Sequence, residues 1–175
     1  MKIDKDKLGL AFKPRPVVLI TTMDDEQNIN AAPYSFIGPV STSPPLISVS
    51  MKESQQTYKN ILLTKKFVVN FTSKAILKQS IDCENKFPNK NKLSAVELDW
   101  EPSEIFKYPK LKKANLVLEC KFYKELDISN SHNIIIAEIV SAEDLNDVDF
   151  CVQFVWSEFS SCSEIIKIDR QRKHI

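Results

Sequence analysis

Glycine is almost absent from this chain of 175 residues, which contains only Gly9 and Gly38. Dinucleotide-binding domains of the Rossmann type need the pattern GxGxxG, and P-loop enzymes need a glycine-rich loop whose backbone holds phosphates. Two distant glycines can form neither pattern. The sequence therefore excludes both classes, and any nucleotide that binds here must be held without a glycine-rich loop.

Clustered metal ligands and an excess of charge are also missing. The chain has only two histidines and no CxxC pair, whereas zinc sites need grouped Cys and His ligands. We therefore expect reduced thiols and no metal site. The 24 Lys and Arg residues almost balance the 23 Asp and Glu residues, so no overall field favours nucleic acid or an anionic membrane. The cysteines are spread along the chain, at Cys83, Cys120, Cys151 and Cys162.

Long apolar runs are lacking as well. The run at residues 17–20 is far shorter than the roughly 20 residues that span a bilayer. The first six residues are mostly charged and lack the apolar core of a signal peptide, so we expect a cytoplasmic protein. With 43% hydrophobic and 27% charged residues, the composition fits a single globular domain over residues 1–175.

The sequence does contain a series of short, β-branched or alternating apolar segments that predict strands. A polar turn at residues 24–28 makes the first two a hairpin, and Pro33 predicts an edge position or a bulge because proline cannot donate to a strand ladder. The predicted strands cover residues 16–23, 30–37, 46–51, 67–71, 114–122, 132–141 and 152–156.

Helical periodicity occurs at only two places, residues 54–66 and 73–83, and Ser54 can cap the first helix. Residues 85–108 predict a mostly irregular excursion. Since strands and helices do not alternate regularly, the pattern favours an antiparallel barrel over a doubly wound parallel sheet.

Three polar clusters follow one another between residues 34 and 60, at strand ends and at the first helix start. A helix start offers free N–H groups and a positive dipole end, and Lys52 adds a fixed charge, so together they suit a phosphate monoester. The residues alone leave a plainer alternative open, in which Ser54 only caps the helix and Lys52 is solvated. The clusters are Tyr34, Ser35 and Phe36; Ser41, Thr42 and Ser43; and Lys52, Ser54, Thr57 and Asn60.

These residues stand in a longer pattern: RPVVLITT at residues 15–22, NAAPYSF at 30–36, PP at 44–45, then Lys52, Thr57 and Asn60. In order and spacing this pattern resembles the flavin reductase-like, FMN-binding split-barrel family. Weaker similarity extends the likeness to about residues 10–142, whereas residues 157–175 diverge. The resemblance implies a mainly β protein, an antiparallel Greek-key split barrel with two or three short helices.

The resemblance also implies a homodimer with FMN near the subunit interface. Tyr34, Ser35 and Phe36 would face the isoalloxazine ring, and Ser41 and Thr42 would lie along the ribityl chain and phosphate. Lys52, Ser54, Thr57 and Asn60 would complete the phosphate site. His132 would lie nearest the nicotinamide of NADH or NADPH, which would pass a hydride to the flavin, with a monooxygenase as one recipient of the reduced flavin.

This chain departs from the family pattern near the expected catalytic residue. Asn130 and Ser131 replace the family's Gly-Asp before the histidine, and no Gly-Gly-Tyr-like ending follows Trp156. The sequence thus supports flavin binding more directly than catalysis. Two other functions stay open: a non-catalytic FMN carrier or electron-transfer protein, and a dimeric interaction module without flavin.

Overall fold

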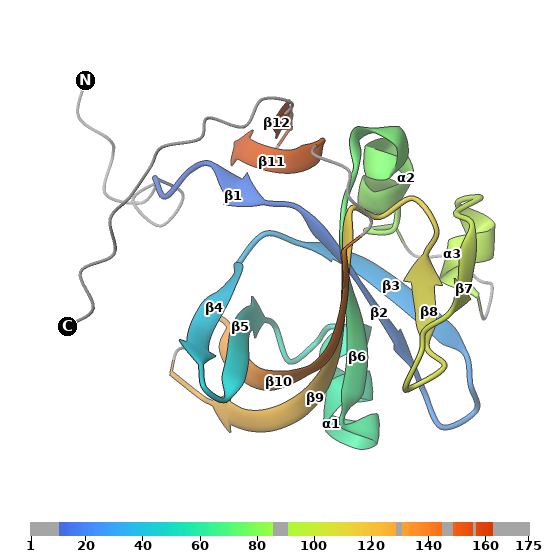
Figure 1. Cartoon of the computed structure of the whole chain (residues 1–175). Helices are drawn as coiled ribbons and strands as arrows, with labels where there is room; N and C mark the ends of the chain where they lie inside the picture. The colour runs from blue at the N-terminus through green and yellow to red at the C-terminus, as the bar shows by residue number, and fades with distance from the viewer. Residues whose placement is uncertain (1–10, 86–90, 129–130, 145–148, 156, 163–175) are drawn as a thin grey trace.

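The computed structural model describes residues 11–85, 91–128, 131–144, 149–155 and 157–162, and within them a seven-stranded antiparallel sheet dominates (Figure 1). The order of its strands is β3-β2-β6-β9-β10-β5-β4. The strands are β2 (Val18–Met23), β3 (Ile29–Tyr34), β4 (Ile37–Thr42), β5 (Pro45–Met51), β6 (Lys66–Phe71), β9 (Leu116–Leu126) and β10 (Asn133–Asp144).

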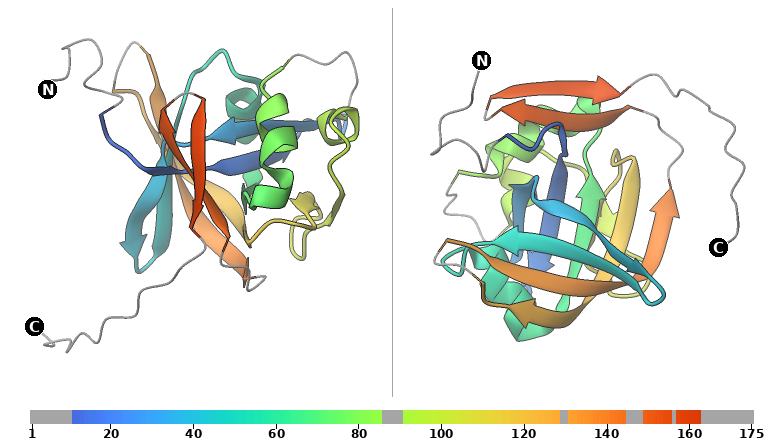
Figure 2. Two further views of the ribbon diagram at one scale, coloured as in Figure 1. Left: turned by 90° about the horizontal axis from the view of Figure 1, so that it is seen from above. Right: turned by 90° about the vertical axis from the view of Figure 1, so that its left-hand side faces the viewer.

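The two edges of this sheet, β3 and β4, are consecutive in the chain and are joined only by Ser35 and Phe36. The sheet curls into a barrel that stays open between these edges (Figure 2), which confirms the antiparallel split barrel. Pro33 lies on edge strand β3, as predicted, and Pro39 lies on edge strand β4 beside a register shift. β4 itself was not predicted, because residues 37–42 show no clear alternation of apolar residues.

The central strands are buried on both faces, which explains their continuous apolar runs. Val18 and Ile20 point into the barrel core, whereas Leu19 belongs to a second core outside the barrel wall. The second core is covered by the helices α2 (Leu77–Asp82) and α3 (Lys92–Ala95) and by the hairpin of β7 (Trp100–Pro102) and β8 (Pro109–Leu111) (Figure 1).

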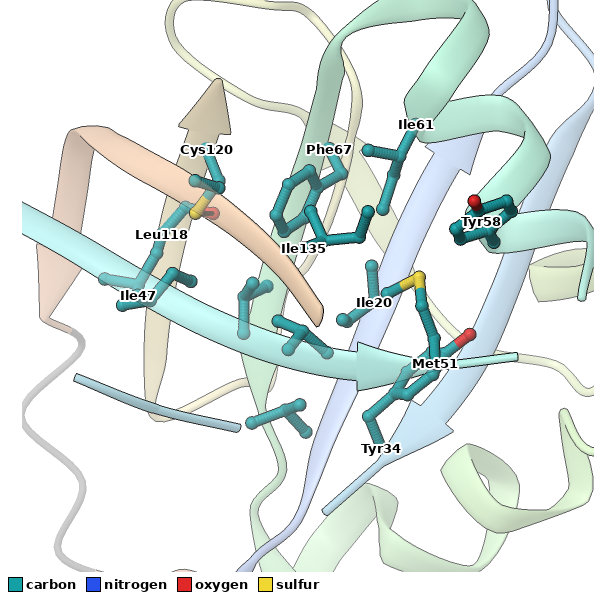
Figure 3. Close-up of a cluster of buried hydrophobic side chains, with 14 residues drawn as sticks. Ile20, Tyr34, Ile47, Met51, Tyr58, Ile61, Phe67, Leu118, Cys120 and Ile135 are labelled. Atoms are coloured by element: carbon teal, nitrogen blue, oxygen red, sulfur yellow. Dashed lines mark hydrogen bonds between the residues drawn. The ribbon is translucent and has the colours of Figure 1, made fainter. Parts of the chain in front are cut away.

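Helix α1 (Gln56–Thr64) packs Tyr58 and Ile61 into the barrel core (Figure 3). The prediction of a helix over residues 54–66 is confirmed, although the helix is shorter at both ends. The prediction that Ser54 caps it is wrong. Gln55 is the N-cap residue and no side chain caps the helix, because the Gln55 side chain instead accepts a hydrogen bond from the Lys52 N–H at 2.8 Å.

A separate three-stranded sheet, in the order β1-β11-β12, lies beside α2 at one end of the barrel (Figures 1 and 2). It consists of β1 (Arg15–Pro16), β11 (Phe150–Val155) and β12 (Glu158–Cys162). β11 matches the strand predicted at 152–156, whereas β12 falls in the segment after residue 156, where no strand was predicted.

The predicted second helix consists of a 3-10 turn, η2 (Lys74–Ile76), followed by α2. The excursion predicted as irregular at residues 85–108 carries α3 and β7, and β8 follows it directly, so this part of the chain is more regular than its proline-rich sequence suggested. In the portion of the chain that the structure describes, no helix is long and apolar enough to cross a membrane.

Candidate functional site

A cavity of about 720 Å³ lies where the barrel is split. This volume is within the range of about 300–1,000 Å³ that is usual for ligand and cofactor sites. Most of the predicted site residues line it, although they come from the ends of several elements. These lining residues are Tyr34, Ser35, Phe36, Lys52, Ser54, Thr57 and His132.

Three predicted site residues do not line this cavity. Ser41 and Thr42 stand at the turn between β4 and β5, where Ser41 Oγ accepts a hydrogen bond from the Ser43 N–H at 3.2 Å. Asn60 is a buried residue of α1, and its amide nitrogen donates to Thr22 Oγ1 at 3.0 Å. Its amide oxygen accepts from Gln56 at 2.7 Å, so Asn60 ties the helix to β2. Cofactor contacts by these three residues stay a prediction.

Tyr34 ends β3 with its side chain between the barrel core and the cavity. Burial raises the pKa of its phenol to about 12, and the nearby Thr57 hydroxyl offsets only part of that rise. The two hydroxyls do not meet hydrogen-bond geometry, and the Tyr34 oxygen is left buried without a partner. A buried hydroxyl in this state can gain a hydrogen bond from a ligand in the cavity.

The start of α1 forms one polar side of the cavity. The first N–H groups of a helix have no intrahelical partner and carry the positive end of the helix dipole, and in α1 no side chain caps them. Asn30 donates from its amide to Thr57 Oγ1 at 2.9 Å, which fixes the Thr57 side chain beside these N–H groups. This is a suitable environment for a phosphate group.

Lys92 belongs to the same side of the cavity, because Ile29 on β3 bridges to Asn91 and so brings Lys92 beside Asn30. Lys92 is half-buried, and burial lowers the pKa of its ammonium group, while the neighbouring Cys83 opposes that change. A bound anion would favour the charged form of this lysine.

Aromatic rings form another side of the cavity. The rings of Phe36 and His132 have centroids 5.9 Å apart and are tilted by 55°. The Arg15 guanidinium lies over the Phe36 ring at 5.4 Å from its centroid. Met51 on β5 pairs with Asn133 on β10. Lys52 directly follows Met51 and His132 directly precedes Asn133, so the two residues stand at neighbouring ends of these antiparallel strands. Two cations therefore flank the ring pair.

The described lining of the cavity is more positive than the protein as a whole. It contains three basic side chains, Arg15, Lys52 and Lys92, and one carboxylate, Glu84. The complete sequence has a net charge of only +1. The cavity therefore favours an anionic ligand.

Sequence reasoning missed Arg15, Asn30 and Lys92 as site residues. Arg15 and Asn30 begin two of the quoted motifs, and that position was the only available signal. Lys92 lies in the excursion at residues 85–108, and nothing local to its sequence distinguishes it from the neighbouring lysines.

A hydrogen-bond network supports the two strand ends beside the cavity. The Asn133 amide nitrogen, next to His132, donates to Glu53 at 3.0 Å and to Glu125 at 2.7 Å. The Tyr58 hydroxyl also donates to Glu125, and this bond raises the pKa of the Tyr58 phenol. The network joins the start of β10 to α1 and to the segment that carries Lys52, so it holds both sides of the site together.

Comparison with known proteins identifies the family. The flavin reductase-like domain family matches residues 11–156, so the chain belongs to this family. A protein of Aquifex aeolicus is 35% identical over 133 residues, which span 73% of this chain and 67% of that protein.

Two solved structures share the fold at lower sequence identity. The 2-nitrobenzoate 2-nitroreductase NbaA of Pseudomonas fluorescens has a TM-score of 0.85 at 23% identity, covering 100% of this chain and 98% of that chain. The nitrilotriacetate monooxygenase component B of Bacillus cereus has a TM-score of 0.82 at 23% identity, covering 95% of each chain.

Proposed function

We propose that this protein binds FMN in the cavity at the barrel split and acts as a flavin reductase that accepts hydride from NADH or NADPH. The observation that carries this proposal is the cavity itself. It joins a phosphate-type helix start, an aromatic wall and three cations in a volume suited to a mononucleotide cofactor. Family membership supports the flavin.

In this arrangement the N–H groups at the start of α1, with Ser54 and Thr57, hold the phosphate, and Lys52 supplies charge. Tyr34 at the end of β3 and the link residues Ser35 and Phe36 lie against the flavin ring. The free hydroxyl of Tyr34 fits a polar atom of such a ligand. FMN supplies the redox chemistry when bound, and the protein contributes binding, orientation and exclusion of water.

His132 is the candidate residue for positioning the nicotinamide donor, because its ring stands against Phe36 at the aromatic side of the cavity. Component B of a monooxygenase shares the fold, which supports a monooxygenase as the partner that receives reduced flavin. We further propose a homodimer, following the family resemblance, and light scattering of the purified protein tests that assembly.

Titration of the protein with FMN tests the binding proposal. Lys52→Ala removes a charge-assisted contact to phosphate, so we expect the Kd for FMN to rise about 10- to 150-fold. Lys59→Ala is the matched control, since Lys59 is an exposed lysine of α1 outside the cavity. Equal affinities for the wild type and Lys52→Ala would mean that the phosphate lies elsewhere.

Anaerobic addition of NADH or NADPH to the FMN-loaded protein tests catalysis. A reductase loses the oxidised-flavin absorbance within seconds to minutes, and His132→Ala slows this loss while FMN stays bound. If FMN binds but neither donor reduces it, the protein is a flavin carrier instead. If FMN neither binds nor raises Tm, the flavin proposal fails as a whole.

A further inference from the structure

Arg15 is a buried cation for which the described structure provides no counter-ion. Its side chain is only 5% exposed, and it forms no ion pair in the described part of the chain. Its Nη1 donates to the Phe12 carbonyl at 2.9 Å, but its Nε is buried without a hydrogen-bond partner. A buried charge is normally paired, because leaving it unpaired is costly.

The position of Arg15 directs it toward a ligand. Arg15 lines the cavity, and β1 fixes its backbone through pairing with Gln153 of β11. Its guanidinium lies over Phe36, whose other neighbour is the His132 ring. An anion that contacts the guanidinium from the cavity would therefore lie beside the ring pair.

We propose that Arg15 binds the anionic group of the ligand that lies on the Phe36–His132 ring pair. Resting on the proposed function, that group is the diphosphate of the nicotinamide dinucleotide. A guanidinium suits this role because its fixed fork of N–H donors matches phosphate oxygens.

The FMN phosphate is a less suitable occupant of this position. The proposed phosphate site is the start of α1, which packs against β2 and β3. Arg15 lies on β1, which pairs with β11 in the other sheet. The site thus has two anion-binding positions on different elements, one for each of two ligands.

Two probes separate these positions. ADP-ribose carries the diphosphate of the dinucleotide without its nicotinamide, whereas FMN carries only a phosphate monoester. Calorimetric titration of Arg15→Gln should show an ADP-ribose Kd about 10- to 100-fold higher than that of the wild type, with the FMN Kd within about twofold. Arg15→Lys keeps the charge but loses the fork of N–H donors, so its Kd for ADP-ribose should lie between those of the wild type and Arg15→Gln.

Lys66→Gln is the matched control. Lys66 also stacks on an aromatic ring, at 5.3 Å from the Phe106 centroid, but does not line the cavity. This variant should leave the affinity for both probes unchanged. Circular dichroism and Tm of each variant show whether it is folded.

The wild type provides a test that needs no variant. Added pyrophosphate should compete with ADP-ribose and leave FMN bound. The proposal is overturned if pyrophosphate displaces FMN alone, if Arg15→Gln weakens FMN alone, or if the folded variant binds both probes normally. If FMN does not bind even to the wild type, the proposed function fails. Loss of ADP-ribose binding in Arg15→Gln would still support the anion site.

Discussion

Tyr34→Phe should stabilise the ligand-free protein, which is unusual for a change inside a barrel core. The Tyr34 side chain is 7% exposed, and its hydroxyl oxygen is buried with no hydrogen-bond partner. A buried polar group without a partner costs about 1–3 kcal/mol. Removing the oxygen keeps the ring packing, so we expect a gain of about 1 kcal/mol at pH 7 and a Tm higher by about 2–4 °C.

The gain should grow at alkaline pH. The folded-state pKa of Tyr34 is about 12, against an ordinary value of 10.0, because burial disfavours the phenolate. The unfolded chain therefore loses this proton first, and the wild type loses stability as pH rises from about 10 to 12. At pH 11 the loss of stability through this group is about 1 kcal/mol. Tyr34→Phe has no phenol at this position and therefore does not undergo this loss of stability.

Urea unfolding of both proteins at pH 7 and pH 11 measures these effects. Tyr123→Phe is the control, since Tyr123 is 59% exposed and its replacement should change neither value. If Tyr34→Phe is less stable than the wild type by more than about 1 kcal/mol at pH 7, the hydroxyl has a partner in solution. If the stability difference between Tyr34→Phe and the wild type is the same at pH 7 and at pH 11, the argument that burial raises the pKa of Tyr34 is refuted.

Three further outcomes follow from the core and its buried groups. Phe67→Ala should cost about 3–5 kcal/mol in urea unfolding because Phe67 is fully buried, whereas the exposed Leu63→Ala should cost little. Glu119→Ala should cost more than about 3 kcal/mol by the same measurement, since its carboxylate accepts hydrogen bonds from Ser103 Oγ and from two backbone N–H groups. A thiol reagent should label Cys162 alone in the native protein, as mass spectrometry would show. The other three cysteines are buried, and burial raises their pKa values.

The barrel wall could be predicted from the sequence because its signals are local. The predicted strand at residues 114–122 alternates, and its Leu116, Leu118, Cys120 and Phe122 side chains all pack in the barrel core. Glu119 has the opposite orientation, yet it is also buried, since residues 103–106 fold over it and satisfy its carboxylate. A charged residue at an outward position normally predicts exposure, and only a partner distant in sequence reverses that here.

β12 and α3 could not be predicted for the same reason. β12 has an alternating polar sequence, and its pairing with β11 rather than an apolar face makes it a strand. α3 has only four residues and buries Leu93 in the second core. Neither element carries enough periodicity in its own sequence to be recognised.

The candidate site also combines residues that local sequence signals predict with residues that only long-range contacts bring together. The β3–β4 link and the start of α1 were predicted because their hydroxyls, prolines and helix start stand close together in the sequence. Arg15 and Lys92 come from segments on either side of that stretch, and β-pairing brings them to the cavity. A nearly neutral chain thereby obtains a cationic cavity from cations that lie far apart in its sequence. The charge that selects an anionic ligand is therefore a property of the sheet topology, whereas the residues expected to hold the cofactor are a property of the local sequence.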